Sequence, residues 1–433
     1  MKAINGTRLQ KYGKLSFGLA TFVLLFVETA VAQTTYTVTD LGTLGGTFSS
    51  TRGLNNRAQV VGDSTLPGDT AQHAFIWERG VMTDLGTLGG SNSVDGFFTS
   101  GGPSESGQVV GVAETSIPDP LGKDFCGFGT HLTCLPFLWQ GGVMTTLPTL
   151  GGNNGAAEDT NNRGQTVGVA ENTTPDQTCQ TPAVHELPVV WQKGEIQELP
   201  TFPGDPDGHA VAINDEGQVV GASGTKRTCA ASNSAFLHAL LWQDGVATDL
   251  GNLGGRMNNL AFQINNRGQV VGISDLRGDQ TQHGFLWQNG VMNDLGTLSG
   301  DVEIWAVGIN NKGQVVGFSF DASGNIRAFL WQNGVMTDLN TLIPADSALY
   351  LLSANGINAR GQIAGLAFLP STGEVHAYLA TPSNGEAATE SATAAAQSAT
   401  DERPKVALPE NVRKLLQQRL RFGRLGIGVP GSR

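Results

Sequence analysis

One phrase recurs along this chain and constrains its fold more than any other feature of the sequence. The stretch HAFIWERGVMTDLGTLGG, residues 73–90, returns as HALLWQDGVATDLGNLGG from residue 238, as HGFLWQNGVMNDLGTLSG from residue 283 and as RAFLWQNGVMTDLN from residue 327. A Gly-Gln phrase such as INNRGQVVG precedes each aromatic phrase. Seven copies of both phrases follow one another at intervals of roughly 44 to 62 residues, which is typical of a repeat architecture.

Each repeat predicts four short antiparallel strands. The first ends in Ile-Asn, a turn with Asn and Gly leads to the second, Gln-Val-Val-Gly, and the aromatic phrase is the third. A Gln-Asn-Gly or similar turn then leads to the fourth strand, Val-Met-Thr-Asp-Leu. Asn-Gly between two apolar runs is a strong hairpin signal, because these residues adopt positive φ at little cost. Four-stranded units at this period predict an all-β propeller, with one sheet per blade around a central channel.

The two ends of the repeat array complement one another. Residues 36–46, YTVTDLGTLGG, contain a fourth strand alone, whereas HAYLATP at 376–382 stops after a third strand. A closed ring would place Tyr36–Leu41 beside His376–Ala380 and would remove two exposed sheet edges. We therefore predict a seven-bladed propeller over residues 33–382 that the N-terminal strand closes. A different blade count or an open array is the alternative.

The N-terminal segment differs from the repeats and predicts secretion. Four basic residues precede an apolar run from Leu15 to Val27, and Ala30-Val31-Ala32 follows. This pattern is typical of a signal peptide, residues 1–32, cleaved after Ala32. A membrane anchor is the alternative, but about 13 apolar residues fall short of the roughly 20 that a spanning helix needs. We therefore expect an extracellular or periplasmic protein.

The C-terminal segment consists of a flexible Ala/Ser/Thr-rich linker, residues 383–408, and a basic tail, residues 409–433. The tail is expected to form a short amphipathic helix, in which Val412, Leu415, Leu416 and Leu420 share one face. Such a helix can contact an anionic membrane surface weakly or pack on the acidic repeats, and a frayed tail is the simplest alternative. Residues 33–400 hold 34 acidic and 14 basic residues, a balance that argues against nucleic acid as a partner.

Three columns of residues recur at fixed positions, and each has a structural explanation. The Trp column is expected to pack between neighbouring blades. The His residues begin the third strand of different blades, so they cannot converge on one metal ion at about 2.0–2.1 Å, and we expect structural hydrogen bonds. The Asp residues that end the fourth strand are expected to hold the turn into the next blade. The columns are Trp77, Trp139, Trp191, Trp242, Trp287 and Trp331; His73, His238, His283 and His376; and Asp40, Asp84, Asp249, Asp294 and Asp338.

Individual features concentrate in the connections between the second and third strands. Three connections are long, Val112–Cys134, Val169–Glu186 and Ala222–Leu237 in repeats two to four, against 9 or 10 residues elsewhere. All four cysteines lie in them. An even cysteine count in a secreted chain favours disulfides, so we predict Cys126–Cys134 and Cys179–Cys229, and a metal site made of all four thiolates is the alternative. These connections share one face of a propeller, which we call the loop face.

The sequence contains no motif that names a reaction. It has no Gly-x-Ser-x-Gly elbow, no His-Glu-x-x-His and no phosphate-binding loop, so no catalytic residue is predicted. Candidate binding residues lie in the long connections and in the connector GDPDGH, residues 204–209. Two carboxylates in such a turn can hold Ca²⁺, although a plain turn is the simpler interpretation and no other cofactor is expected. The candidates are Asp124, His131, His185, Glu186, Asp205, Asp207 and His209.

The repeated phrases resemble a known family. HAFIW, HGFLW and HAYLA, together with DLGTLGG and INNRGQVVG, are similar to the HAF-repeat family of predicted extracellular bacterial proteins, over about residues 36–382. The second repeat departs from the pattern, since PSESGQVVG lacks the Asn pair and LPFLW lacks His-Ala. The resemblance implies an extracellular location and a repeat architecture, and it implies no activity.

Two classes of function fit this sequence. We predict a secreted, monomeric scaffold for binding or interaction, whose loop face over blades 2 to 4 holds an extracellular polysaccharide or protein. The alternative is an extracellular glycan hydrolase or lyase with its site at the channel mouth, because the chemistry of such a fold depends on the site it carries. A surface-layer or stress protein without a small ligand is a third interpretation. Converging carboxylates or histidines, or turnover of a glycan, would favour the enzyme.

Overall fold

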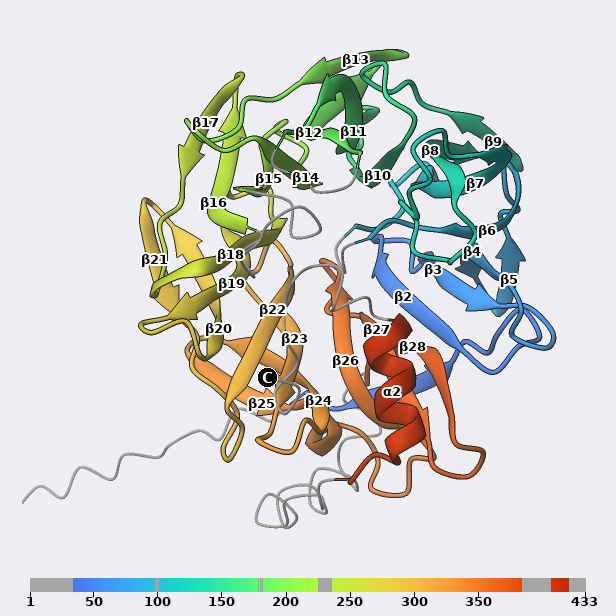
Figure 1. The fold of residues 1–433 in the computed structure, drawn as a ribbon. Helices are drawn as coiled ribbons and strands as arrows, with labels where there is room; N and C mark the ends of the chain where they lie inside the picture. Colours follow the sequence, from blue (N-terminus) through green and yellow to red (C-terminus); the bar gives the residue numbers. More distant parts are fainter. Residues whose placement is uncertain are drawn as a thin grey trace, which may run out of the picture. The chain divides into compact units, whose positions relative to one another are not determined.

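The structure is a computed structural model that describes residues 34–97, 101–177, 179, 182–224, 236–383 and 406–419. The predicted signal peptide, residues 1–32, lies outside the described residues, as do residues 384–405 of the predicted linker and 420–433 of the tail. Almost all the regular structure in the described part of the chain is β-strand (Figure 1).

Seven four-stranded antiparallel sheets form the blades of a propeller, as the repeat predicted (Figure 1). Blades 1 to 4 comprise β2 (Ser49–Leu54), β3 (Val60–Thr65), β4 (Gln72–Glu78) and β5 (Val81–Asp84); β6 (Gly89–Val94), β7 (Val109–Pro118), β8 (Leu132–Gln140) and β9 (Val143–Thr146); β10 (Gly155–Thr160), β11 (Gln165–Pro175), β12 (Val184–Gln192) and β13 (Glu195–Glu198); and β14 (Asp207–Ile213), β15 (Val219–Gly224), β16 (Phe236–Gln243) and β17 (Val246–Asp249). Blades 5 and 6 comprise β18 (Gly254–Ile264), β19 (Val270–Leu276), β20 (Gln282–Gln288) and β21 (Val291–Asp294); and β22 (Glu303–Ile309), β23 (Val315–Phe320), β24 (Ile326–Gln332) and β25 (Val335–Asp338). Blades 4 and 5 also share one parallel bridge, Phe236↔Asn258.

The seventh blade combines the two ends of the repeat array. It comprises β26 (Tyr350–Ile357), β27 (Ile363–Leu369), β28 (Glu374–Pro382) and, as its outer strand, β1 (Tyr36–Asp40). β1 pairs antiparallel with β28 in a register that runs from Tyr36↔Pro382 to Asp40↔Tyr378. The predicted closure is therefore confirmed, and the N-terminal strand completes the ring.

The Gly that ends each Gly-Gln phrase is required by a close approach between strands. The innermost strand of each of the seven blades has a register shift, such as the one between Thr51 and Gly53 in β2, where an extra residue pushes the backbone toward the second strand. A Cβ atom on Gly62 would overlap the carbonyl oxygen of Ser50, and one on Gly317 would overlap that of Trp305. The second strand is also buried along its length, as β3 and β23 show. This is why the phrase is a continuous apolar run ending in Gly.

The long connections of blades 2 to 4 are shorter than the sequence predicted, because strands extend into them. β7 continues to Pro118 and β8 begins at Leu132, so the loop of blade 2 is residues 119–131 and not Val112–Cys134. In blade 3, β11 and β12 leave residues 176–183 as the loop. In blade 4 the connection is residues 225–235, which lie outside the described residues. The second repeat, which departs from the family pattern, has an inner strand that ends early, at Val94.

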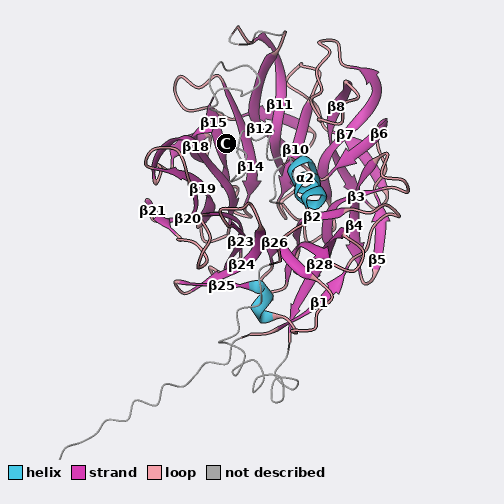
Figure 2. Cartoon of the chain, turned by 60° about the horizontal axis from the view of Figure 1, so that its bottom comes forward, coloured by secondary structure: helices cyan, strands magenta, loops and turns pink. Residues whose placement is uncertain are grey.

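Helix α2 (Glu410–Arg419) packs on the loop face near blades 6 and 7 (Figures 1 and 2). Val412 and Leu416 are buried within the apolar cluster that the inner strands form around the axis. The guanidinium of Arg413 donates to the carbonyl oxygen of Ser323 at 3.2 Å, in the loop between β23 and β24. Of the two packing partners predicted for this helix, the acidic propeller is the one observed. No described helix is long and apolar enough to span a membrane.

Candidate functional site

Four of the seven predicted binding residues come together on the loop face, between blades 3 and 4. Asp207 and His209 lie at the start of β14, and His185 and Glu186 lie at the start of β12. One carboxylate oxygen of Asp207 accepts the backbone N–H of Glu186 at 2.9 Å and lies 3.3 Å from Nδ1 of His185. Nε2 of His209 lies 3.6 Å from a carboxylate oxygen of Glu186. The register between these blades therefore assembles two imidazoles and two carboxylates.

A fifth residue joins this group, and sequence reasoning missed it. Asp176 is the first residue after β11, in the loop of blade 3, and it is buried. Asp176, His185 and Asp207 each offer one ligand atom, and these three atoms all lie within 4.8 Å of one another. We call these three residues the loop-face triad. A carboxylate in a predicted insertion gives no sequence signal for this contact, because the path of the insertion decides it.

The other predicted residues serve the loops in which they lie. Asp124 accepts the backbone N–H of Gly129 at 3.1 Å, and Nδ1 of His131 lies 2.9 Å from the carbonyl oxygen of Gly122, both within the loop of blade 2. Asp205 lies 2.8 Å from Nδ1 of His238, which is a member of the His column. These three residues lie outside the group at blades 3 and 4.

Of the two predicted disulfides, one lies within the described residues. Cys126 and Cys134 are joined in blade 2, with their Cα atoms 6.2 Å apart. This bridge closes the loop of blade 2, where Phe125 and both cysteines are buried in the axial apolar cluster. The other predicted bridge, Cys179–Cys229, involves Cys229, which lies outside the described residues.

The His and Asp columns pair with each other at the outer strands. Nδ1 of His73 lies 2.9 Å from Asp84, Nδ1 of His283 lies 2.9 Å from Asp294, and Nδ1 of His376 lies 3.0 Å from Asp40. In blade 6, Arg327 replaces the His and binds Asp338 at 2.9 Å. Burial alone would raise the pKa of Asp294, but hydrogen bonds from His283 and Gly296 and the charge of His283 lower it.

Residues of the Trp column contact the preceding blade. The indole N–H of Trp191 donates to the carbonyl oxygen of Pro148 at 2.8 Å, and that of Trp242 donates to Pro200 at 2.7 Å. Trp77 packs in one cluster with Ala364, Ala377 and Leu379 of blade 7. The recurring aromatic residues thus fill the space between blades.

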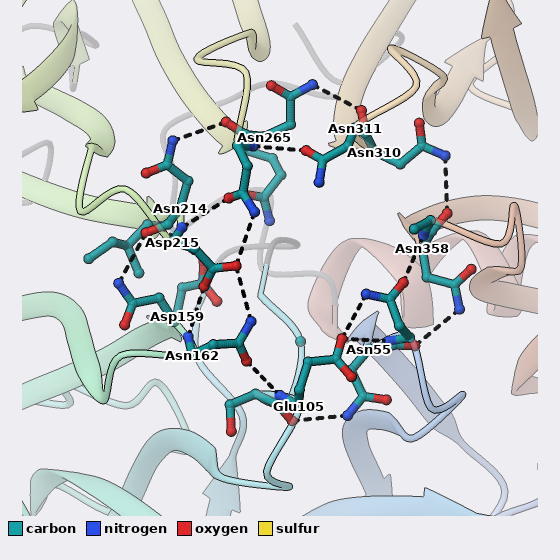
Figure 3. A pocket seen from close by; sticks show the side chains of 18 of the residues that line it. Asn55, Glu105, Asp159, Asn162, Asn214, Asp215, Asn265, Asn310, Asn311 and Asn358 are labelled. Carbon is teal, nitrogen blue, oxygen red and sulfur yellow. Dashed lines mark hydrogen bonds between the residues drawn. The ribbon is translucent and has the colours of Figure 1, made fainter.

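The opposite face, which we call the turn face, carries a pocket of about 200 Å³ where the turns between first and second strands meet (Figure 3). Its inner ring is built from the first Asn of the repeated Asn pair. In six blades this side-chain amide donates to the carbonyl oxygen of the equivalent residue in the next blade at 2.9–3.0 Å. The six donors are Asn55, Asn161, Asn214, Asn265, Asn310 and Asn358.

A second ring uses the next residue of each turn. In six blades the backbone N–H of this residue donates to the side-chain oxygen of its equivalent in the following blade, at 2.8–3.0 Å. The ring is interrupted between Asn311 and Ala359, because Ala359 has no side-chain oxygen. The members are Asn56, Glu105, Asn162, Asp215, Asn266, Asn311 and Ala359. Sequence reasoning assigned the Asn pair to a turn and missed both rings, although the recurrence of a second Asn was a signal that a single turn does not need.

Two carboxylates of this pocket have pKa values moved in opposite directions. Burial raises the pKa of Asp159 to about 7, although the carboxylate accepts the backbone N–H groups of Ile213 and Thr160. Burial alone would also raise the pKa of Asp215, but hydrogen bonds from Asn162 and Asn266 lower it. At neutral pH the pocket therefore holds one carboxyl group that exchanges a proton and another that stays ionised.

Comparison with known proteins gives distant structural likenesses. No protein-family model matches the chain, and no curated protein matches its sequence. A gluconolactonase from Xanthomonas campestris is similar in structure with a TM-score of 0.37 and 8% identity, covering 82% of this chain and 93% of that one. A mutant of AofleA from Arthrobotrys oligospora has a TM-score of 0.34 and 10% identity, covering 70% of this chain and 88% of that one. These likenesses are too distant to indicate a function.

Proposed function

We propose that this protein is a secreted binding scaffold that holds an extracellular polysaccharide or protein on the loop face, over blades 2 to 4. The observation that carries the proposal is the convergence of His185, Glu186, Asp207 and His209 from two neighbouring blades. Polar groups that project from rigid strands are suited to recognition, because little side-chain freedom remains to be lost on binding.

The arrangement of the loop face supports the same region. Helix α2 covers the side near blades 6 and 7, whereas the longer loops belong to blades 2 to 4. The Cys126–Cys134 bridge constrains the loop of blade 2 and keeps it from sampling many conformations. Covalently constrained, longer loops beside a polar group favour a ligand site in this sector.

The test is capture on an array of microbial polysaccharides and cell-surface proteins by the full mature chain. Glu186→Gln combined with His209→Gln should reduce capture at least tenfold, because both members of the polar pair are altered without loss of bulk. Glu374→Gln is the matched control, since Glu374 forms a similar pair with His376 at 3.4 Å in blade 7. Equal capture by the double variant and the control would refute the loop-face assignment.

A second candidate is a glycan hydrolase or lyase that works at the turn-face pocket. The observation that favours it is the opposite displacement of the pKa values of Asp159 and Asp215, since such pairs provide the acid and base roles of many active sites. Incubation of the wild-type chain with a glycan library should then release products that Asp159→Asn does not release. Absence of products from the wild type would leave the binding scaffold as the only function of the two.

A further inference from the structure

We propose that the loop-face triad, Asp176, His185 and Asp207, binds a divalent metal ion of the zinc class. The inference rests on the proposed function in one respect, because it places the ion within the same ligand site and makes it part of ligand recognition. Its geometric basis is independent of any ligand.

The separations within the triad fit ligands of one ion. Nδ1 of His185 and Oδ1 of Asp207 are 3.3 Å apart, and two ligands about 2.1 Å from a tetrahedral ion lie about 3.4 Å apart. The three ligand atoms lie within 4.8 Å of one another. Every ligand pair of a tetrahedral ion needs this spacing of about 3.4 Å, so binding requires the longest separation to close by up to about 1.4 Å. His185 and Asp207 already have this spacing, so the Asp176 side chain would have to move toward them.

The residue at the position of Asp207 differs between blades of this same chain, and blade 6 has Glu303 there. In blades 2 and 3 the equivalent residues are Asn92 and Asn154, whose side-chain oxygens accept a backbone N–H of the preceding blade at 3.1 and 2.9 Å. Asp207 makes the same bond to Glu186 at 2.9 Å. An Asn at this position would therefore satisfy this bond, and an Asp adds a second carboxylate oxygen that can bind a cation.

The exchange changes what the rest of the side chain can do. The amide nitrogens of Asn92 and Asn154 donate to Glu114 at 2.8 Å and to Glu171 at 3.0 Å. An ionised Asp207 cannot donate, and it faces the carboxylate of Asp176 in a buried setting. A cation placed between two carboxylates is attracted by both of them. A metal ion there would take one oxygen from each of Asp176 and Asp207, and His185 would supply the third ligand atom.

The donor set selects the class of ion. Ca²⁺ takes six to eight oxygen ligands, whereas an imidazole nitrogen and carboxylate oxygens are donor types that Zn²⁺ and similar ions bind in proteins. Three protein ligands leave at least one coordination position open. Because the triad adjoins Glu186 and His209, a hydroxyl or carboxylate group of a bound polysaccharide can complete the coordination shell.

The experiment is calorimetric titration of the chelator-treated full mature chain with ZnCl2, under non-reducing conditions. The wild type should bind one equivalent, and Asp207→Asn should weaken binding at least 100-fold. This variant should fold, because Asn92 and Asn154 already occupy the equivalent positions. His283→Gln is the control, since His283 pairs with Asp294 at 2.9 Å and, among the described residues, no third metal-ligating side chain joins them, and it should bind as the wild type does. Absence of zinc binding by the wild type, or equal binding by Asp207→Asn, would overturn the inference.

The array assay separates this inference from the proposed function. Loss of capture after chelation and its return with Zn²⁺, in the wild type only, supports both. Zinc binding that Asp207→Asn abolishes, combined with capture that neither chelation nor Glu186→Gln with His209→Gln affects, sustains the metal site and refutes the loop-face ligand site. If the wild type binds no zinc but the double variant abolishes capture, the loop-face ligand site is sustained and the metal site is overturned.

Discussion

A disulfide engineered between Thr37 and Thr381 should stabilise the propeller more than an equivalent bridge inside a single blade. The two residues are direct partners on β1 and β28, and both are exposed. Partner Cα atoms on antiparallel strands lie about 4.5–5.5 Å apart, within the range that a disulfide spans. The bridge would close a loop of roughly 345 residues in the unfolded chain, for which chain entropy gives a gain of about 6 kcal/mol.

The matched control is Gln332→Cys with Val335→Cys, which occupies the same register in blade 6. Both of its residues are exposed, but the loop contains only four residues, so the expected gain is about 2 kcal/mol. Urea unfolding of the oxidised variants against oxidised wild type measures the difference in the free energy of unfolding, and thiol titration verifies each bridge. If Thr37→Cys with Thr381→Cys forms no bridge, or if its bridge stabilises the protein no more than the control, closure by the N-terminal strand is refuted.

Three further predictions concern the turn face and the helix. The pKa of Asp159 is raised from 3.8 to about 7, so the folded state keeps a proton that the unfolded chain loses. The free energy of unfolding should therefore fall by up to about 4 kcal/mol between pH 4 and 7. In urea unfolding at several pH values, Asp159→Asn should lack this pH dependence, and an unchanged pH dependence would contradict the protonation of Asp159. Asn265→Ala should lower the free energy of unfolding by about 3 kcal/mol, because it removes the amide that donates to Asn310 and Gln269 and leaves their buried oxygens without this donor. Asn266 is exposed, so Asn266→Ala should lower the free energy of unfolding by less than about 1 kcal/mol. Equal losses of stability in urea unfolding would argue against the inner ring. Val412→Asp should release helix α2 from the propeller and accelerate tryptic cleavage within it, and wild-type cleavage rates would show that the burial of Val412 does not hold the helix.

The ring closure was predictable because it depends on the phase of the repeat. A chain that begins with a fourth strand and ends with a third can complete its last sheet in only one way if it closes, and β1 beside β28 is that arrangement. The Cys126–Cys134 bridge was predictable for a similar reason, since a separation of eight residues favours a local loop. Both inferences need only the positions of residues along the chain.

The contacts between blades were not predictable in the same way. The amide of Asn358 donates to the carbonyl oxygen of Asn55, which is 303 residues away in sequence, and nothing in a single repeat indicates that successive turns meet at the axis. The triad has the same character, because the register of β12 against β14 places His185 beside Asp207. Asp176 lies in the long connection of blade 3, so the direction of its side chain depends on the path of that loop.

The most direct test of a ligand site on the loop face is capture by a chain in which residues 119–131 and 176–183 are replaced with the short connection of blade 5, between β19 and β20. The assay is the array of polysaccharides and cell-surface proteins, with circular dichroism to verify that the blades still form. We predict that the replaced chain keeps its β-structure and loses at least nine-tenths of the captured signal. Capture at the wild-type level by a folded chain with both loops replaced would contradict a loop-face site.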